Sequence, residues 1–165
     1  MENNLLILAS CSPRRKKLLT QIGLKFKVVP SCIIENHDLN LPPEAFVEHW
    51  GRKKAKNVVI DYPDNLVIGA DTIVVLDEHI LGKPRDINQS FKMLHTLSGR
   101  THEVITGVAL IWKNKGIDIT FHARTYVTFR KIPENSICYY IDNYNPLDKA
   151  GSYGIQDWFS VWVEK

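Results

Sequence analysis

The chain has 165 residues, of which 44% are hydrophobic, 10% aromatic and 24% charged. This composition is typical of globular proteins and excludes the disordered and fibrous classes, and the length fits a single domain over residues 1–165 better than two. The formal net charge is only +3, because 21 Lys and Arg are nearly matched by 18 Asp and Glu. The overall charge therefore indicates no particular partner.

The start of the chain predicts an apolar strand and a tight turn into a helix. Residues 5–9 form a short continuous apolar run, and Ser12 and Pro13 suit the N-cap and the first position of a helix. This helix is expected to stop at Gly23, and residues 25–29 predict a second strand. The apolar run is too short for a signal peptide or a membrane span, so we expect a cytoplasmic protein that does not bind membranes.

A longer helix is predicted over residues 42–60. Its apolar residues fall on one helical stripe that also carries Lys54: Val47, Trp50 and Val58. Residues 66–76 then predict a long apolar strand, followed by a turn and a short partner strand at residues 80–82.

The next segments predict a capped helix and a hairpin. Asp86 is expected to cap a helix that ends at Ser98 and Gly99, and strands are expected at residues 102–112 and 117–130.

The last elements predicted are a helix and a strand. Pro133 suits the start of a short helix to about residue 143, and residues 152–163 have the alternating pattern of a strand. Together, the segments predict an α/β fold on a mixed sheet.

Two arginines, Arg14 and Arg15, follow directly after the predicted N-cap Ser12 and Pro13. The positive end of a helix dipole disfavours cations, so this turn suits a bound anion such as phosphate. The alternative is that both arginines point into solvent, at a cost of a few tenths of a kcal/mol. The turn lacks the glycine spacing of a P-loop.

Asp71 lies within the long apolar strand, where a carboxylate without a partner is expensive. A structural ion pair is one explanation. A functional site is the other, and we favour it because Gly69 and Ala70 would leave room for a ligand or metal to approach the strand.

Further charged residues are candidate partners for Asp71. Lys54 lies on an apolar helix stripe and Lys83 at a strand end, and together with arginines they suit a polyphosphate substrate. Glu35 could add a second metal-binding carboxylate. The structural alternatives are a lysine that extends to solvent and an exposed loop glutamate. The six histidines, among them His37, show no metal-ligand spacing.

A set of short motifs, in order along the chain, resembles the Maf family of nucleoside triphosphate pyrophosphatases, also called septum formation inhibitors. The motifs are residues 8–15 (LASCSPRR), 69–72 (GADT), 82–84 (GKP), 98–102 (SGRTH), 106–108 (TGV) and 148–156 (DKAGSYGIQ). Each motif is short, but the ordered set is specific and spans nearly the whole chain.

The resemblance implies hydrolysis of a nucleoside triphosphate between its α and β phosphates, with a divalent metal, Mg²⁺ or Mn²⁺. Asp71 would activate water, and Glu35 and Asp71 would hold the metal. The resemblance also implies an elongated mixed sheet flanked by helices, as in Maf and ITPase proteins, commonly in a homodimer. The expected substrate-binding residues are Ser10, Ser12, Arg14, Arg15, Lys54, Thr72, Lys83 and Gln156.

Within the family, the combination of Arg14, Thr72 and Gln156 resembles the branch that acts on dTTP and UTP. A glutamine amide both donates and accepts hydrogen bonds, which suits the imide edge of thymine or uracil. Modified pyrimidine nucleotides fall within the expected substrate range. Family members continue beyond the segment at Gln156 through a further strand and helix, so we expect a C-terminal element to be missing here.

Two other functions fit some of these features. A chain of this kind could bind nucleotides as a cell-division regulator without hydrolysing them. The basic clusters at residues 14–17 and 52–56 could instead contact nucleic acid, but no aromatic residues are interleaved with them, so we rank this last and expect no nucleic-acid partner.

Overall fold

The computed structural model describes residues 5–35 and 39–165. Its strands are β1 (Leu6–Leu8), β2 (Phe26–Val28), β3 (Val67–Leu76), β4 (His79–Leu81), β5 (Thr101–Trp112) and β6 (Ile117–Thr128). Its α-helices are α1 (Pro13–Gln21), α2 (Pro43–Val59), α3 (Ile87–Leu97) and α4 (Glu134–Tyr144), and its short 3₁₀ helices are η1 (Lys113–Lys115), η2 (Pro146–Asp148), η3 (Ala150–Ser152) and η4 (Trp158–Trp162). His37 lies outside the described residues.

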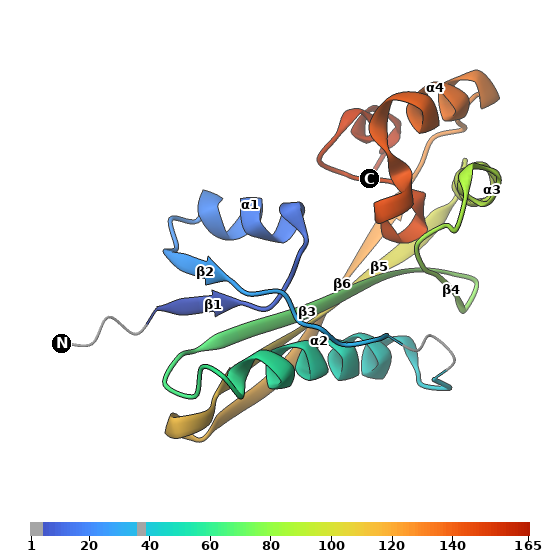
Figure 1. Cartoon of the computed structure of the whole chain (residues 1–165). Coiled ribbons are helices and arrows are strands. Elements are labelled where there is room, and N and C mark those ends of the chain that lie inside the picture. Colours follow the sequence, from blue (N-terminus) through green and yellow to red (C-terminus); the bar gives the residue numbers. More distant parts are fainter. Residues whose placement is uncertain (1–4, 36–38) are drawn as a thin grey trace. The chain divides into compact units, whose positions relative to one another are not determined.

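The six strands form a mixed sheet in the order β2-β1-β3-β5-β6, with β4 paired to β3 (Figure 1). β1 runs parallel to both β2 and β3, whereas β4 runs antiparallel to β3. This confirms the predicted α/β class, a mixed sheet flanked by helices. Across the described ranges, none of the helices has the length and apolar character needed to cross a bilayer.

Two predicted helix starts are confirmed in detail. Ser12 is the N-cap of α1 and its side chain accepts a hydrogen bond from the backbone of Arg15, with Pro13 as the first helical residue. Asp86 caps α3 in the same way, accepting from the backbone N–H of Gln89 at 2.7 Å. Both caps satisfy backbone donors that have no partner within the helix.

The chain divides into two compact units. The first contains the residues up to Asp71 together with Thr106–Ala123, and the second contains Thr72–Ile105 and Arg124–Lys165. The long strands β3, β5 and β6 each contribute residues to both units.

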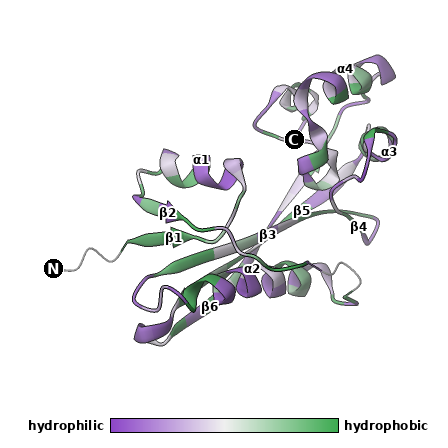
Figure 2. Cartoon of the chain, viewed as in Figure 1, coloured by the Kyte–Doolittle hydropathy of each residue, from purple (hydrophilic) through white to green (hydrophobic). Residues whose placement is uncertain are grey.

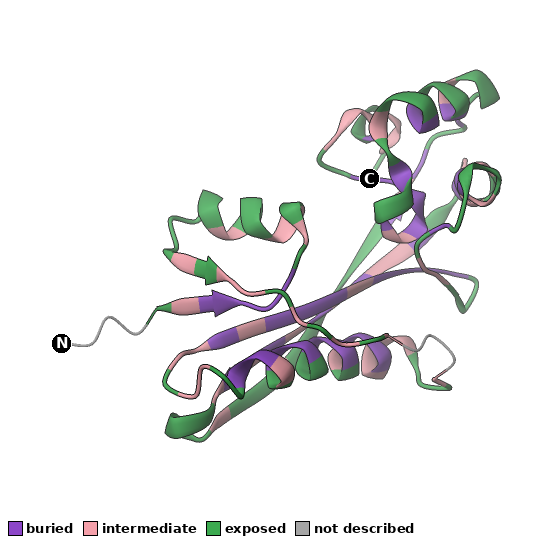
Figure 3. Cartoon of the chain, viewed as in Figure 1, coloured by how far each residue is buried: buried purple, intermediate pink, exposed green. Residues whose placement is uncertain are grey.

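In the first unit, helix α2 packs on the sheet through a buried stripe, visible in purple in Figure 3, while its other side is exposed. The helix backbone approaches the sheet closely at three glycines. A Cβ added at Gly69 would lie 2.1 Å from the carbonyl oxygen of Gly51, and one added at Gly107 would lie 2.4 Å from that of Val47. Since no real Cβ tolerates such distances, glycine is required for this packing.

Apolar side chains complete the core of the first unit. β1 and the first part of β3 are predominantly hydrophobic, as the green ribbon in Figure 2 shows. The buried members of this cluster are Ile7, Ala9, Ala55, Val58, Val59, Val67, Ala109 and Ile111.

The second unit has a core rich in aromatic rings. Phe129 lies 4.8 Å from both His102 and Tyr153 and 5.2 Å from Phe159, measured between ring centroids. The Nε2 atom of buried His102 lies 2.7 Å from the hydroxyl of Tyr153. This core joins α3 and α4 to the ends of β3 and β6.

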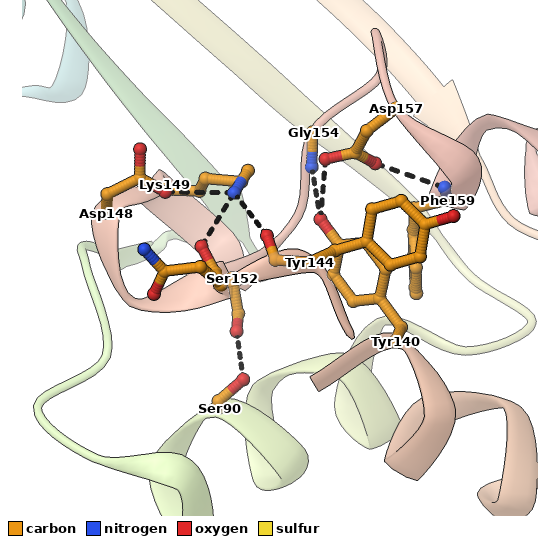
Figure 4. Close-up of polar contacts among 10 residues, drawn as sticks. Ser90, Tyr140, Tyr144, Asp148, Lys149, Ser152, Gly154, Asp157 and Phe159 are labelled. Atoms are coloured by element: carbon orange, nitrogen blue, oxygen red, sulfur yellow. Dashed lines mark hydrogen bonds and ion pairs between the residues drawn. The ribbon is translucent and has the colours of Figure 1, made fainter. Parts of the chain in front are cut away.

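Polar contacts fix the segment that follows α4 (Figure 4). The buried ammonium of Lys149 donates to the carbonyl oxygens of Tyr144 and Asn145, at 2.9 and 2.7 Å, at the end of α4. Ser152 contacts Ser90 of α3 through their hydroxyls. The segment is therefore attached to both helices.

The prediction of a strand at residues 152–163 is wrong. The segment contains 3₁₀ turns, and its β-type pairing is an isolated bridge between Val163 and Phe129, which directly follows β6. Asp157 caps η4 by accepting from the backbone of Phe159, and Trp158 packs on Tyr144 with ring centroids 6.0 Å apart. Capping and aromatic packing on α4 override the alternating sequence pattern.

Candidate active site

The centre of the candidate site is an ion cluster in the first unit. Lys54 of α2 donates to Asp71 of β3, with 2.7 Å between Nζ and Oδ1, and its Nζ lies 3.1 Å from Oε1 of Glu35. The side chains of Lys54 and Asp71 are 9% and 10% exposed, whereas that of Glu35 is 31% exposed. The cluster is thus reached from solvent on the Glu35 side.

The contact between Lys54 and Asp71 bears on two predictions, one about a lysine on an apolar helix stripe and one about a carboxylate within an apolar strand. Lys54 lies on the apolar stripe of α2 and does not extend to solvent, because Asp71 faces it from the strand. A simple structural ion pair would need one lysine and one carboxylate. Here two carboxylates share one buried ammonium, and Arg15 supplies a second positive charge close to both of them.

The glycines explain how the helix presents Lys54 to the strand. We expected Gly69 and Ala70 to leave room for a ligand, and this prediction is wrong for Gly69. Its space is filled by the backbone of α2, since an added Cβ would lie 2.1 Å from the Gly51 oxygen and 2.6 Å from the nitrogen of Ala55. The close approach allows Lys54, one residue before Ala55, to reach Asp71.

Arg15 belongs to the same electrostatic environment. Burial lowers the pKa of Arg15, while the charges of Asp71 and Glu35 raise it and that of Arg14 lowers it. Its guanidinium donates to the hydroxyl of Ser10, with 3.2 Å between NH1 and Oγ. The half-buried Arg15 therefore does not point freely into solvent.

The two serines shape the turn between β1 and α1. The hydroxyl of buried Ser10 also accepts from the backbone N–H of Ser12 at 3.2 Å, and the Ser12 hydroxyl caps α1. No acidic residue lies in the first turn of this helix. The turn thus has backbone donors and arginines that suit the oxygen atoms of a phosphate.

The donor set at Glu35 and Asp71 fits a hard divalent cation. Both carboxylates converge on a single position, as their shared contact with Lys54 Nζ shows. Within residues 5–35 and 39–165, no group of three or more His, Cys, Asp or Glu residues is arranged to hold a metal. Mg²⁺ commonly uses one or two carboxylates and takes its other ligands from water and substrate phosphates.

The other predicted substrate-binding residues belong to the second unit. Thr72 is half-buried on β3, whereas Lys83 and Gln156 are exposed. The segments that carry them are adjacent, because the backbone N–H of Gly151 donates to the carbonyl of Gly82 at 3.0 Å. Gly151 also lies against Val74, and its φ of +65° favours glycine.

Sequence reasoning missed the residues that support these side chains. Gly51 has no predicted role, and Gly107 and Lys149 belong to the motifs at residues 106–108 and 148–156 without a role of their own. Both glycines permit the close contact between α2 and the sheet, and Lys149 caps α4 with its ammonium. A glycine within an apolar helix stripe, such as Gly51, was the available signal.

Known proteins resemble this chain over most of its length. Residues 5–165 match the family model described as Maf-like protein. The chain is 46% identical over 158 residues to the dTTP/UTP pyrophosphatase of Koribacter versatilis (strain Ellin345), covering 96% of this chain and 81% of that protein. It is 48% identical over 151 residues to the dTTP/UTP pyrophosphatase of Moorella thermoacetica, covering 92% of this chain and 78% of that protein.

A solved structure shares the fold at lower sequence similarity. The structure of the Staphylococcus aureus Ham1 protein aligns with a TM-score of 0.50 at 13% identity, covering 75% of this chain and 71% of that one. At this identity the likeness concerns the fold alone. The family model and the sequence relatives together cover nearly the whole chain, and the chain therefore belongs to the Maf family.

Proposed function

We propose that this chain is a nucleoside triphosphate pyrophosphatase that hydrolyses dTTP and UTP to the nucleoside monophosphate and pyrophosphate. The observation that carries the proposal is the convergence of Glu35 and Asp71 on the buried ammonium of Lys54, in a chain nearly half identical to proteins named dTTP/UTP pyrophosphatases. Such a cluster supplies both the carboxylates and the cations that hydrolysis of a phosphoanhydride requires.

The basic residues and the turn after β1 bind the phosphates. Arg15 and Lys54 neutralise the triphosphate, Ser10, Ser12 and Arg14 complete the turn at the start of α1, and Lys83 adds a further cation. The half-buried Arg15 is held by Ser10, so it is positioned before substrate arrives. Preorganised cations of this kind stabilise charge that develops in the transition state.

Asp71 acts as the general base. Its carboxylate takes a proton from a water molecule whose oxygen attacks the phosphorus of the α-phosphate, and the bond to the bridging oxygen breaks so that pyrophosphate leaves with its electron pair. Before a metal binds, Oδ1 of Asp71 accepts a hydrogen bond from Lys54, which orients the carboxylate. Glu35 and Asp71 would hold a divalent metal, which would neutralise further phosphate charge.

Base selectivity depends on residues outside this cluster. The exposed amide of Gln156 can donate to one group and accept from the other on the imide edge of thymine or uracil, and Thr72 and Arg14 accompany it in the dTTP/UTP branch that the sequence resembles. Cytosine presents a different pattern of donors and acceptors at this edge, so dCTP should be a poor substrate.

A cytoplasmic location and a homodimer are also part of the proposal. The three cysteines, Cys11, Cys32 and Cys138, are free thiols, which is common in a reducing compartment. The homodimer follows from the family resemblance.

The test is release of pyrophosphate by the purified protein from dTTP, UTP, dCTP and dATP, with Mg²⁺, with Mn²⁺ and without metal. We expect release from dTTP and UTP in the presence of metal. Asp71→Asn should reduce turnover by a factor of about 10² to 10⁴, the usual contribution of a general base, while the circular dichroism spectrum is retained.

Asp61→Asn is the matched control, because Asp61 is an exposed aspartate of the same unit and lies outside the ion cluster. This variant should hydrolyse dTTP at the wild-type rate. Folded wild-type protein that binds nucleotide saturably but releases no pyrophosphate from any triphosphate would contradict the proposal.

A further inference from the structure

The ammonium of Lys54 lies where the proposed function places a divalent metal. Its Nζ atom lies 2.7 Å from Asp71 Oδ1 and 3.1 Å from Glu35 Oε1, the carboxylates that are expected to hold the metal. A divalent cation the size of Mg²⁺ binds carboxylate oxygens at about 2.1 Å. A metal held by these two oxygen atoms would therefore overlap with the ammonium.

We propose that Lys54 is a built-in counter-ion of Glu35 and Asp71, and that its ammonium and a divalent metal exclude each other at these carboxylates. The inference rests on the proposed function, because it concerns the metal of that reaction. In the metal-free protein the lysine neutralises a carboxylate that is only 10% exposed and that would be costly to leave without a partner. When metal binds, Lys54 must move away from both oxygens.

The balance of charge couples the metal to the nucleotide. Glu35 and Asp71 carry two negative charges, and Lys54 and Arg15 carry two positive charges in the same electrostatic environment. A divalent metal would neutralise the carboxylates and release Lys54. The buried region would then hold an excess of two positive charges, which is unfavourable.

A polyphosphate removes that excess. Its anionic oxygens provide new partners for Lys54 and Arg15, so metal and triphosphate each make the binding of the other more favourable. By thermodynamic linkage, the factor by which nucleotide tightens metal binding equals the factor by which metal tightens nucleotide binding. Lys54 thus suppresses metal binding in the absence of substrate and contributes to phosphate binding in its presence.

The alternative is that Lys54 is a structural partner of Asp71 that stays in place throughout. In that case its removal leaves an uncompensated buried carboxylate and lowers stability, but the ammonium does not compete with metal. The two cases predict different effects of removing Lys54 on the affinity of the protein for metal in the absence of nucleotide.

The experiment measures Mn²⁺ binding by electron paramagnetic resonance of the free ion, with and without a dTTP analogue that carries a methylene group between the α and β phosphates. For the wild type we expect weak binding of Mn²⁺ alone and binding at least about tenfold tighter with the analogue, a typical coupling between sites. Lys54→Met should bind Mn²⁺ alone at least about tenfold tighter than wild type, and the effect of the analogue should shrink.

Lys56→Met is the matched control. Lys56 is exposed on the same helix, and its Nζ lies 3.8 Å from Asp118, away from Glu35 and Asp71. The variant removes the same charge from the molecule, so an equal gain in Mn²⁺ affinity would show that only net charge matters and would overturn the proposal. Lys54→Arg retains a cation and should keep Mn²⁺ binding weak.

Two results would overturn the inference while leaving the enzyme intact. One is a folded Lys54→Met variant that binds Mn²⁺ alone no tighter than the wild type. The other is a measurement on the wild type alone, in which the dTTP analogue does not change the affinity for Mn²⁺. Failure of the proposed function would be distinguished from both, because it would be seen as absence of pyrophosphate release by the wild type.

Discussion

Tyr140 donates a hydrogen bond of 2.9 Å from its hydroxyl to the carboxylate of Asp157. The same hydroxyl accepts from the backbone N–H of Gly154 at 3.1 Å (Figure 4). The backbone N–H of Asp157 in turn donates to the carbonyl of Gly154. One buried phenol therefore holds both ends of the turn that exposes Gln156. Burial and the neighbouring carboxylate of Asp157 raise the pKa of Tyr140, so it stays a donor throughout the physiological pH range.

Tyr140→Phe should destabilise the protein by about 1–3 kcal/mol, because it leaves the buried N–H of Gly154 and one carboxylate oxygen of Asp157 without their partner. The free energy of unfolding in urea measures this effect. Tyr139→Phe is the control, since Tyr139 is the neighbouring residue on α4 and is 49% exposed. Equal stability of the two variants would show that the hydroxyl of Tyr140 has no special structural role.

Lys149→Met should also lower stability, by about 2–4 kcal/mol. The substitution keeps much of the buried chain but removes the ammonium that contacts the carbonyls of Tyr144 and Asn145. Lys131→Met, at an exposed position in the same unit, serves as the comparison in thermal unfolding. A melting temperature equal to that of the wild type would mean that water replaces the ammonium at the end of α4.

Gly69→Ala should destabilise the protein by about 1–3 kcal/mol and reduce pyrophosphate release. The new methyl group would lie 2.1 Å from the Gly51 oxygen, so α2 must shift and Lys54 must move relative to Asp71. Gly82→Ala is the control for stability, because an added Cβ there meets nothing within 4 Å. Retention of full stability and activity by Gly69→Ala would contradict the close packing of helix and strand.

Stability should fall as the pH drops from about 6.5 to about 4, in part because of His102. Burial lowers the pKa of His102 to about 4, whereas an unfolded histidine titrates near 6.5. Between these values the unfolded chain binds a proton that the folded protein excludes. The free energy of unfolding therefore decreases by up to about 3 kcal/mol as the pH approaches 4. Above pH 6.5 the residue is neutral in both states and the effect vanishes.

His102→Gln tests this assignment. The difference in unfolding free energy between pH 7 and pH 4.5 should be smaller in the variant than in the wild type. An identical pH dependence in the two proteins would assign the acid sensitivity to other groups.

The helices and most strands could be predicted because their signals are local. Ser12 and Asp86 cap helices where the sequence predicted, and the stripe of α2 placed Lys54 on the buried side. The prediction of the ion cluster also rested on a local feature, because Asp71 is a charged residue within an apolar strand. Its pairing with Lys54 was one possibility among several, since the two residues are 17 positions apart and belong to different elements.

The two incorrect predictions concern positions whose structure depends on contacts with distant segments of the chain. Gly69 looked like open space from the sequence alone, but the backbone of α2 occupies that space. Residues 158–162 alternate as a strand would, but packing on α4 and the cap at Asp157 favour a 3₁₀ helix. In both cases the deciding partner lies outside the segment, where a pattern of neighbouring residues carries no information.

The contact of α2 with the sheet at Gly51, Gly69 and Gly107 also bears on how the sequence can change during evolution. Because the helix meets the strands through main-chain atoms, the separation of Lys54 and Asp71 does not depend on the size of the apolar side chains around them. Core residues such as Val58 and Val59 can therefore vary among relatives while the charged cluster keeps its geometry. Gly69 and Gly107 cannot vary in this way, because an added Cβ would lie 2.1 and 2.4 Å from main-chain atoms of α2, so mutational tolerance should be lowest at these two strand positions.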